Sequence, residues 1–343
     1  MITIHDNYNL LRHNTFRIDA TCTRWIDYDD AADLPVIADM VEDQRFFNIG
    51  RGSNIVLYPH YDGTMLHSQI CHVDTVACDG STVHLTAGAG CLFDRIVEHA
   101  AARGLWGLEN LSNIPGTVGA SVVQNIGAYG VEIKDLVEKV DCYDLHTRRT
   151  VELRAEDCRF AYRDSLFKCP ENRRLVVTAV TYRLSAIPEP KLEYGDLRQR
   201  LEHLDNPTPM QVRDAIIEMR AQKLPDPDQT GSAGSFFKNP VLSADQFVAL
   251  TQLYRKYHGA EAQVPHYNLP GGDVKVPAAW LLDRCGFKGR QMGNVALWPT
   301  QPLIMVNSTG KATGPEISDI SQYIADKVLE TYGIHLQTEV EFI

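Results

Sequence analysis

The stretch Gly231-Ser232-Ala233-Gly234-Ser235-Phe236-Phe237-Lys238-Asn239-Pro240 decides how the rest of the chain is interpreted. Two glycines and two small residues precede a hydroxyl, two aromatic rings, a cation and an amide. Glycines this close to polar side chains let a backbone approach a ligand or take a positive φ. The alternative is a tight turn in which Ser235 bonds only its own backbone. The stretch alone favours the turn, so the other motifs must decide.

Length and charge exclude several classes of protein. A chain of 343 residues is longer than one hydrophobic core normally accommodates, so we expect two or three domains. Its composition, 44% hydrophobic and 22% charged residues, is typical of a globular protein. A formal charge of −11 argues against a nucleic-acid-binding or anionic-membrane surface, although local cations can still hold an anionic small molecule. No apolar run has the length of a signal peptide or a membrane span, and no heptad seam is visible. We therefore expect a cytoplasmic monomer without membrane insertion.

The cysteines and histidines give no metal-site pattern. None of the eight cysteines lies in a C-x-x-C pair, and the 12 histidines show no H-E-x-x-H motif, so we predict no metal. Without an export signal we expect reduced thiols. The cysteines are Cys22, Cys71, Cys78, Cys91, Cys142, Cys158, Cys169 and Cys285.

Two further glycine-rich segments suggest ligand binding. The loop Gly50 to Asn54 separates two short apolar runs, so it is either a plain hairpin connection or a phosphate cradle of backbone N–H groups with Ser and Asn donors. It lacks the third glycine of a dinucleotide fingerprint and the ending of a P-loop. The segment from Ile114 to Gly130 is rich in glycine and carries no charge. It is too apolar for a surface linker and too glycine-rich for a core strand, which favours a buried backbone around a planar or phosphorylated ligand.

Hydrophobic periodicity predicts a mixed α+β chain. We expect strands over 82–89, 138–143 and 174–180, and a closing strand over 334–343 with His335, Gln337, Glu339 and Glu341 on its polar face. We expect helices over 91–103, 208–223, 243–259, 277–286 and 315–332. Leu92 and Tyr257 are among the side chains predicted to face inward.

These motifs occur together and in an order that resembles the UDP-N-acetylenolpyruvoylglucosamine reductase (MurB) family. The resemblance spans about Asn14 to Phe342 and includes Tyr162-Arg163-Asp164-Ser165 and the terminal Glu339-Val340. Leu192 to Leu197 resembles the form that keeps a tyrosine-bearing substrate loop. Arg17 and Thr338 stand where the family commonly has glycine and proline, and the match weakens around Leu297 to Pro299, which leaves substrate contacts after Arg290 open.

The resemblance implies a fold and a domain order. It implies a two-lobed α+β FAD-binding domain of the vanillyl-alcohol-oxidase (PCMH) type and a separate α+β substrate-binding domain. Residues 1–70 would form the first lobe, to which the strand 334–343 returns. Residues 71–207 would form the second lobe, and residues 208–333 the substrate-binding domain.

The resemblance also implies the reaction and the residues. The family reduces UDP-N-acetylglucosamine enolpyruvate to UDP-N-acetylmuramate for peptidoglycan, with hydride passing from NADPH through non-covalent FAD to the enolpyruvyl methylene. Ser235 resembles the proton donor, and Arg163 and Glu339 the pair that faces the substrate carboxylate. The implied substrate contacts are Tyr194, Lys223, Asn239 and Lys275. The implied flavin contacts are Gly50, Arg51, Gly52, Ser53, Asn54, Ile114, Pro115, Gly116, Gly119, Ala120, Asn125, Gly127, Ala128 and Tyr129.

The chemistry explains why these groups are needed. Hydride addition drives two electrons toward the substrate carboxylate, and a fixed guanidinium such as Arg163 stabilises that charge. Glu339 fits beside an anion when it is a protonated acid, whereas the alternative is an ordinary salt bridge to Arg163. No amino acid supplies hydride, so a redox cofactor is required. A flavin oxidase would lack the Ser235, Arg163 and Glu339 set, a catalytically inactive sugar-nucleotide binder would not need Ser235, and no G-x-S-x-G elbow supports a serine hydrolase.

Overall fold

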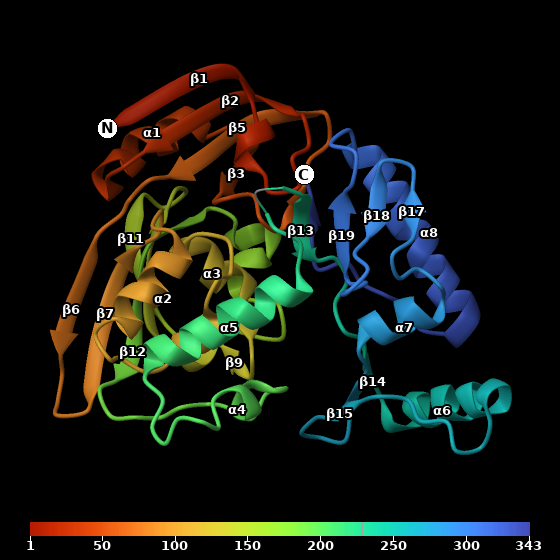
Figure 1. Ribbon diagram of the computed structural model, residues 1–343. Coiled ribbons are helices and arrows are strands. Elements are labelled where there is room, and N and C mark those ends of the chain that lie inside the picture. The colour runs from red at the N-terminus through yellow and green to blue at the C-terminus, as the bar shows by residue number, and fades with distance from the viewer. Residues whose placement is uncertain (228) are drawn as a thin grey trace. The chain divides into compact units, whose positions relative to one another are not determined.

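The computed structural model describes residues 1–227 and 229–343, which fold as two compact units (Figure 1). Unit 1 comprises Met1–Asn9, Thr21–Arg51 and Tyr61–Gln222. Unit 2 comprises Leu10–Ala20, Gly52–His60 and Lys223–Ile343. The chain therefore leaves and re-enters each unit, and the segments that flank the loop Gly50 to Asn54 belong to different units.

The first sheet of unit 1 has the strand order β1-β2-β5-β3. Its strands are β1 (Ile2–Asn9), β2 (Thr21–Tyr28), β5 (His60–Ser68) and β3 (Phe46–Ile49). β1 and β2 are antiparallel, whereas β3 and β5 are parallel with Phe46 opposite Thr64. Helix α1 (Leu34–Val41) buries Leu34, Ile37, Ala38 and Val41 in a cluster shared with the sheet.

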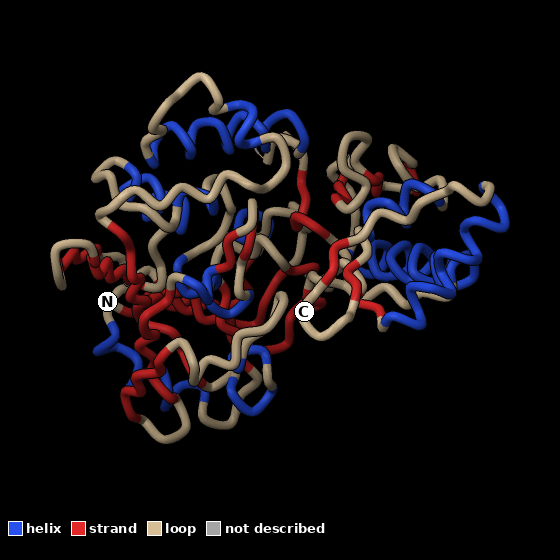
Figure 2. Tube along the Cα trace, turned by 90° about the horizontal axis from the view of Figure 1, so that it is seen from below, coloured by secondary structure: helices blue, strands red, loops and turns tan. Residues whose placement is uncertain are grey.

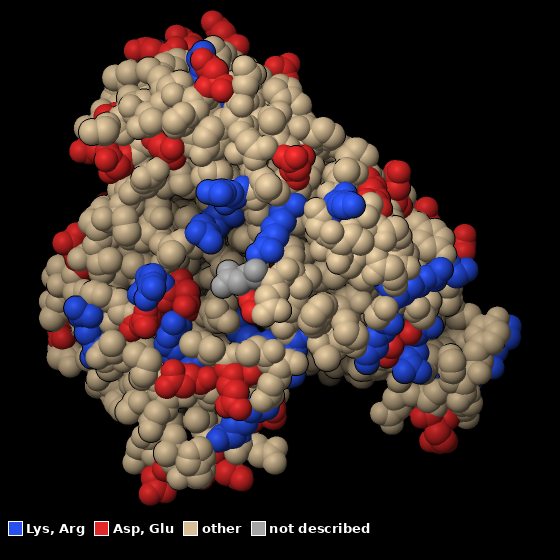
Figure 3. All heavy atoms as spheres, turned by 45° about the horizontal axis from the view of Figure 1, so that its top comes forward, with Lys and Arg blue, Asp and Glu red and all other residues tan. Residues whose placement is uncertain are grey.

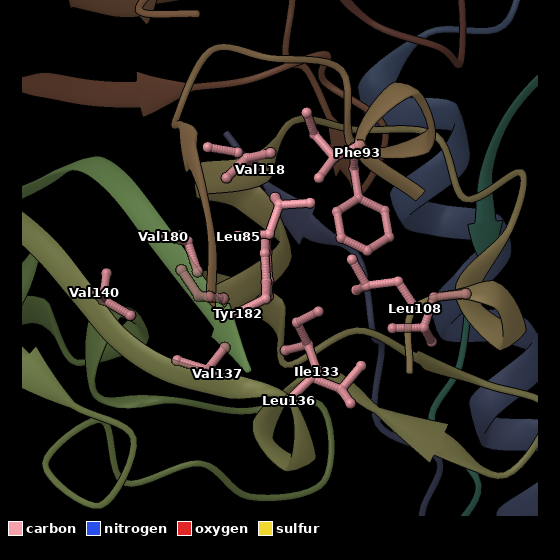
Figure 4. Close-up of a cluster of buried hydrophobic side chains, with 14 of the residues drawn as sticks. Leu85, Phe93, Leu108, Val118, Ile133, Leu136, Val137, Val140, Val180 and Tyr182 are labelled. Carbon is pink, nitrogen blue, oxygen red and sulfur yellow. The ribbon is translucent and has the colours of Figure 1, made fainter. Parts of the chain in front are cut away.

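The second sheet of unit 1 is antiparallel, with the order β11-β10-β12-β7-β6. Its strands are β6 (Val73–Ala77), β7 (Thr82–Gly88), β10 (Val137–Asp144), β11 (Arg149–Arg154) and β12 (Leu175–Ser185). Helices α2 (Phe93–Ala101) and α3 (Val118–Gln124) contribute to the large core beside it (Figure 4). Phe93, Val118 and Tyr182 lie in this core with Leu85 and Val180, so the glycine-rich segment is anchored at α3 by apolar packing.

Short elements complete unit 1. A hairpin of β8 (Gly127–Ala128) and β9 (Val131–Glu132) follows α3. Helices α4 (Leu197–Arg200) and α5 (Pro209–Lys223) bury Leu197, Val212, Ile216 and Met219 in a cluster with Trp106. Single 3₁₀ turns cover Leu11–His13, Ala31–Asp33, Glu109–Leu111, Ile133–Asp135, Leu166–Lys168 and Pro170–Asn172, the first of them in unit 2.

The described residues of unit 2 form three small sheets and three helices. The sheets are β13-β19-β18-β17, β14-β16-β15 and the parallel pair β20-β4. Their strands are β13 (Gly231–Ser235), β19 (Ile304–Asn307), β18 (Val295–Leu297), β17 (Gln291–Met292), β14 (Val241–Leu242), β16 (Val274–Lys275), β15 (Tyr267–Asn268), β20 (Glu341–Phe342) and β4 (Ile55–Val56).

The helices of unit 2 are α6 (Ala244–His258), α7 (Ala278–Arg284) and α8 (Gly314–Tyr332), drawn as blue tubes in Figure 2. α6 and α7 both contact α8. Ser243 begins α6 with a capping box, as its sequence predicts, because its hydroxyl accepts from the Gln246 N–H.

Four sequence predictions need correction. Helix α2 begins at Phe93, so Leu92 lies outside it and is exposed. Tyr257 is 71% exposed because α6 buries only Leu250 and Tyr254. The closing strand is reduced to Glu341–Phe342, because the backbone before it pairs with other segments in turn. Cys71 and Cys91 form a disulfide, since folding brings their Cα atoms to 4.7 Å, so these two cysteines are not free thiols.

The division into three domains stays a proposal. The helix that opens the predicted substrate-binding domain, α5, packs within unit 1 over most of its length. The C-terminal β20 pairs with β4, which the sequence assigned to the first lobe.

Candidate functional site

Strand β13 holds Ser235 at an irregular position. β13 pairs with β19, and the register shifts between Ser232 and Ser235. Gly234 has φ +72°, a conformation that glycine adopts readily because it has no side chain. This conformation permits the bulge. Ser235 is half-buried, and its hydroxyl forms no hydrogen bond to any other residue within 1–227 and 229–343. The hydroxyl is therefore available to a ligand.

The N-terminal segment of unit 2 explains why β13 begins with glycine. A Cβ on Gly231 would lie 2.3 Å from the Phe16 carbonyl oxygen, which leaves no room for a side chain. The Ser232 N–H donates to the Thr15 carbonyl at 3.0 Å, and the Thr15 hydroxyl donates to the Ser232 carbonyl at 2.6 Å. Asn14 is buried and closes its own turn through the Leu10 and Ile18 carbonyls. The Asn14-Thr15-Phe16 motif thus supports the strand that carries Ser235.

Glu339 lies beside the same strand end. Its backbone N–H donates to the Phe236 carbonyl at 2.8 Å, and Lys238 N–H donates to the Gln337 carbonyl at 2.9 Å. The Asn54 side-chain amide donates to the Glu339 carbonyl at 3.0 Å. Unit 2 therefore brings together the backbones next to Ser235, Glu339 and one end of the predicted phosphate loop.

Arg163 lies in unit 1, against the predicted flavin segment. Its residue has φ +55°, an uncommon conformation for a side chain of this size. Its Nη2 donates to the Gly127 carbonyl at 2.6 Å, and its Nη1 donates to the Asn125 carbonyl at 3.4 Å. A Cβ on Gly127 would lie 3.0 Å from Nη1. The guanidinium is thus held in a fixed orientation by the glycine-rich backbone.

Within the segment Ile114 to Gly130, several glycines allow close backbone approaches. Gly119 N–H donates to the Ala89 carbonyl at 2.9 Å, and a Cβ on Gly119 would lie 3.0 Å from the Ala89 Cβ. A Cβ on Gly50 would lie 2.7 Å from the Thr117 hydroxyl oxygen, so this glycine approaches the start of α3. The two predicted flavin-binding segments therefore meet within unit 1 at Gly50 and Thr117.

Asn125 serves the protein scaffold. It is fully buried, and it ends α3 with φ +43°. Its amide nitrogen donates to the Ala161 carbonyl and to Glu132, while its oxygen accepts from the Lys134 N–H. Asn125 thereby links the glycine-rich segment to the loop that carries Arg163.

The loop Gly50 to Asn54 fits a phosphate-containing cofactor such as FAD. The adjacent backbone N–H groups of Arg51 and Gly52 donate to no other described residue. Gly52 has φ +60°, and a Cβ there would lie 2.2 Å from the His13 carbonyl oxygen. Consecutive N–H groups at a positive-φ residue form an anion-binding concavity.

The predicted substrate residues lie in both units. In unit 1, the ring of Tyr194 packs edge-on to that of Tyr129 at 5.8 Å, and half of Tyr194 is exposed. In unit 2, the Asn239 side-chain oxygen accepts from the Ala278 N–H, the first N–H of α7, at 2.9 Å. Lys275 pairs with Val241 in the β14-β16 ladder and lies over the Tyr267 ring.

Lys223 ends α5, and its backbone carbonyl accepts from the Thr300 hydroxyl at 2.7 Å. The short strands β14 and β16 place Asn239 and Lys275 near one another, because Val241 follows Asn239 by two residues. These are placements in the fold, and their roles toward a substrate stay proposals.

The described part of the chain holds no group of three or more His, Cys, Asp or Glu side chains that could hold a metal ion. No helix among these residues is long and apolar enough to cross a membrane. Figure 3 shows acidic and basic side chains interspersed on the drawn face, with the two kinds next to one another in several places.

Comparison with known proteins identifies the family. Residues 32–153 match the family model described as FAD binding domain. Residues 226–343 match the one described as UDP-N-acetylenolpyruvoylglucosamine reductase, C-terminal domain. The UDP-N-acetylenolpyruvoylglucosamine reductase of Porphyromonas gingivalis W83 is 40% identical over 343 residues, covering 99% of each chain. The chain belongs to the UDP-N-acetylenolpyruvoylglucosamine reductase family.

Other members of the family agree. The reductase of Bacteroides fragilis YCH46 is also 40% identical, over 99% of this chain and all of its own length. The crystal structure of the reductase (MurB) from Thermus caldophilus is similar in fold, with a TM-score of 0.67 at 22% identity and coverage of 100% and 99% of the two chains. The predicted α+β fold, with an FAD-binding domain and a family-specific C-terminal domain, is confirmed.

Proposed function

We propose that this chain reduces UDP-N-acetylglucosamine enolpyruvate to UDP-N-acetylmuramate, the reductase step of peptidoglycan synthesis, with NADPH as co-substrate. The family supplies the reaction, since relatives of full length carry the reductase name. The observation that carries the proposal for this chain is the Ser235 hydroxyl, which is half-buried, uncommitted within the described residues and next to the Glu339 backbone.

FAD is the proposed cofactor, and when bound it would supply the transfer of hydride from NADPH to the enolpyruvyl methylene. We assign its non-covalent binding to Gly50, Arg51, Gly52, Ser53 and Asn54 of the loop and to Ile114, Pro115, Gly116, Gly119, Ala120, Asn125, Gly127, Ala128 and Tyr129 of the glycine-rich segment. The uncommitted N–H groups of Arg51 and Gly52 support this assignment.

Arg163 is assigned to the substrate carboxylate. The Gly127 and Asn125 carbonyls fix the guanidinium, so little reorganisation is needed when negative charge develops on the carboxylate. A planar guanidinium can also donate two parallel hydrogen bonds to a carboxylate, which would orient the enolpyruvyl group. Tyr162 lies under the guanidinium, 5.5 Å from it, and limits its movement further.

Ser235 is assigned as the proton donor and Glu339 as its partner in stabilising the enolate. A serine hydroxyl is a weak acid, so its contribution depends on position, and the bulge at Gly234 fixes that position. The Glu339 carboxyl, in its protonated form, would donate a hydrogen bond to the developing enolate. The backbone hydrogen bond from the Glu339 N–H to the Phe236 carbonyl keeps the backbones of the two residues close together.

The remaining assignments concern binding and cellular context. We assign Tyr194, Lys223, Asn239 and Lys275 to the UDP-sugar, because cations and amide donors suit a diphosphate in an otherwise acidic protein. We also propose that the protein acts as a cytoplasmic monomer, with two FAD-binding lobes and a third, substrate-binding domain.

The test of the function is an anaerobic flavin titration of the purified protein. NADPH should bleach the yellow colour, and UDP-N-acetylglucosamine enolpyruvate should then restore it with formation of UDP-N-acetylmuramate. A colourless protein, or a bleached protein that only oxygen restores, would contradict the proposal. The second outcome would favour an oxidase.

A further inference from the structure

Arg220 of helix α5 is a partly buried cation that the assignments above do not use. Its Nε is buried and has no hydrogen-bond partner in the described chain. No ion pair joins its side chain to a carboxylate of any described residue. The residue as a whole keeps partial solvent access.

A second arginine of the same helix, in contrast, is paired with a carboxylate. Arg213 lies seven residues earlier, and its Nη1 and Nη2 donate to the two carboxylate oxygens of Asp94 at 2.5 and 2.7 Å. Asp94 also accepts from the Asn113 N–H at 2.5 Å. Asp94 therefore accepts three hydrogen bonds, none of them from Arg220, and its charge reaches Arg220 only at a distance.

Burial of an unpaired guanidinium is unfavourable, because the charge loses its hydrating water and gains no carboxylate or hydrogen bond in exchange. Burial accordingly lowers the pKa of Arg220, although its electrostatic interactions with Tyr129 and Asp94 act in the opposite direction. A cation in such a position is stabilised when an anionic ligand binds beside it.

The position of Arg220 indicates which anionic ligand binds beside it. Lys223, a proposed substrate contact, follows it by three residues, so the two cations lie on the same side of α5. Tyr129 packs against the apolar cluster that α5 buries, and Tyr194 of the proposed substrate loop packs against Tyr129 at 5.8 Å. A guanidinium binds two phosphate oxygens at once, which an ammonium cannot do.

We propose that Arg220 binds the diphosphate of the UDP-sugar substrate and acts with Lys223 as a two-cation clamp. The proposal rests on the proposed function, because it needs a nucleoside diphosphate sugar as substrate. FAD and NADPH also contain a diphosphate, so the experiment must separate the three ligands.

The test measures binding of UDP to the FAD-loaded holoenzyme, followed by calorimetry, for Arg220→Gln and Arg220→Lys. Arg220→Gln should weaken UDP binding by at least about tenfold, because it removes a charge-assisted hydrogen bond. Arg220→Lys should recover part of that loss, because it restores the charge without the paired donors. The flavin content and the apparent NADPH affinity should stay within about twofold of wild type.

Arg213→Gln is the matched control, because it removes a guanidinium from the same helix that has its own carboxylate. It should lower the melting temperature while leaving UDP affinity within about twofold of wild type. Unchanged UDP affinity in Arg220→Gln would overturn the proposal. Loss of flavin or of NADPH affinity from a folded Arg220→Gln protein would also overturn it, since the cation would then serve another diphosphate. A wild-type protein that binds no UDP would instead contradict the proposed function.

Discussion

Replacing Asp94 with asparagine tests how α5, which carries Arg220, is fixed to unit 1. The change keeps the side chain's shape but removes the charge that holds Arg213. Breaking a buried ion pair costs about 3–5 kcal/mol. Because Arg213 is 7% exposed and Asp94 is 32% exposed, solvent weakens this pair. Asparagine also keeps one acceptor, so we expect a loss of about 2–3 kcal/mol.

The assay is thermal unfolding of Asp94→Asn followed by circular dichroism, and the loss should lower the melting temperature by about 5–10 °C. Asp214→Asn is the control, since Asp214 is an exposed carboxylate of the same helix. It should change stability by less than about 0.5 kcal/mol. If Asp94→Asn unfolded at the wild-type temperature at neutral pH, the ion pair would not hold α5.

The pH dependence of the free energy of unfolding tests the same ion pair. Burial alone would raise the pKa of Asp94, but hydrogen bonds from Arg213 and the Asn113 N–H outweigh it, and the pKa is lowered. A lowered folded-state pKa gives stability that is present above the unfolded value and is lost as pH falls through the folded value. The gap between wild type and Asp94→Asn should thus be constant from about pH 8 to 5 and shrink below about pH 4. A gap that widened in acid would refute the reasoning.

Three further predictions follow from particular contacts. Gly231→Ala would put a Cβ 2.3 Å from the Phe16 carbonyl oxygen, so urea unfolding should show a loss of about 1–3 kcal/mol; an unchanged midpoint would contradict the close approach. Thiol titration of the unfolded, unreduced protein should find six thiols, the eight cysteines less Cys71 and Cys91; eight would exclude the disulfide. Arg163→Lys should lower kcat by about 10²-fold or more under saturating NADPH, because an ammonium cannot replace the paired donors; a wild-type kcat would remove Arg163 from the mechanism.

Local signals predicted most of the regular structure. The helices that begin after Thr208 and Ser243 were predicted because a cap and an apolar stripe are both local features of the sequence. The strand–loop–strand around Gly50 was predicted because glycine separates two β-branched and aromatic runs. The family motifs added what local pattern could not, namely a prediction of which loops share one site.

Features that depend on tertiary approach were not predictable from spacing. Alternation suggested one strand from Ile334 to Ile343, yet its backbone pairs first with Phe236 and Lys238 and then with β4, so only its last residues form a regular strand. The side-chain burial still alternates there, with Leu336 and Val340 buried. The Cys71–Cys91 disulfide has no sequence signal, because separate loops bring its ends together.

Arg220 could have been found in the sequence. Arg213 and Arg220 lie seven residues apart beside the inward-facing Val212, Ile216 and Met219. A repeat of arginine next to an apolar stripe indicates cations at the edge of a core, where each needs an anionic partner. The sequence could not say that, among the described residues, Arg213 has a carboxylate partner and Arg220 has none.

The most direct test of the account is anaerobic stopped-flow kinetics of Ser235→Ala and Ser235→Cys. NADPH should bleach the flavin of both variants at the wild-type rate, because Ser235 is assigned only to the proton. The enolpyruvyl substrate should then restore the colour of Ser235→Ala about 10²–10⁴-fold more slowly than that of wild type, with Ser235→Cys between them. Recovery of Ser235→Ala at the wild-type rate would contradict the assignment of Ser235 as the proton donor.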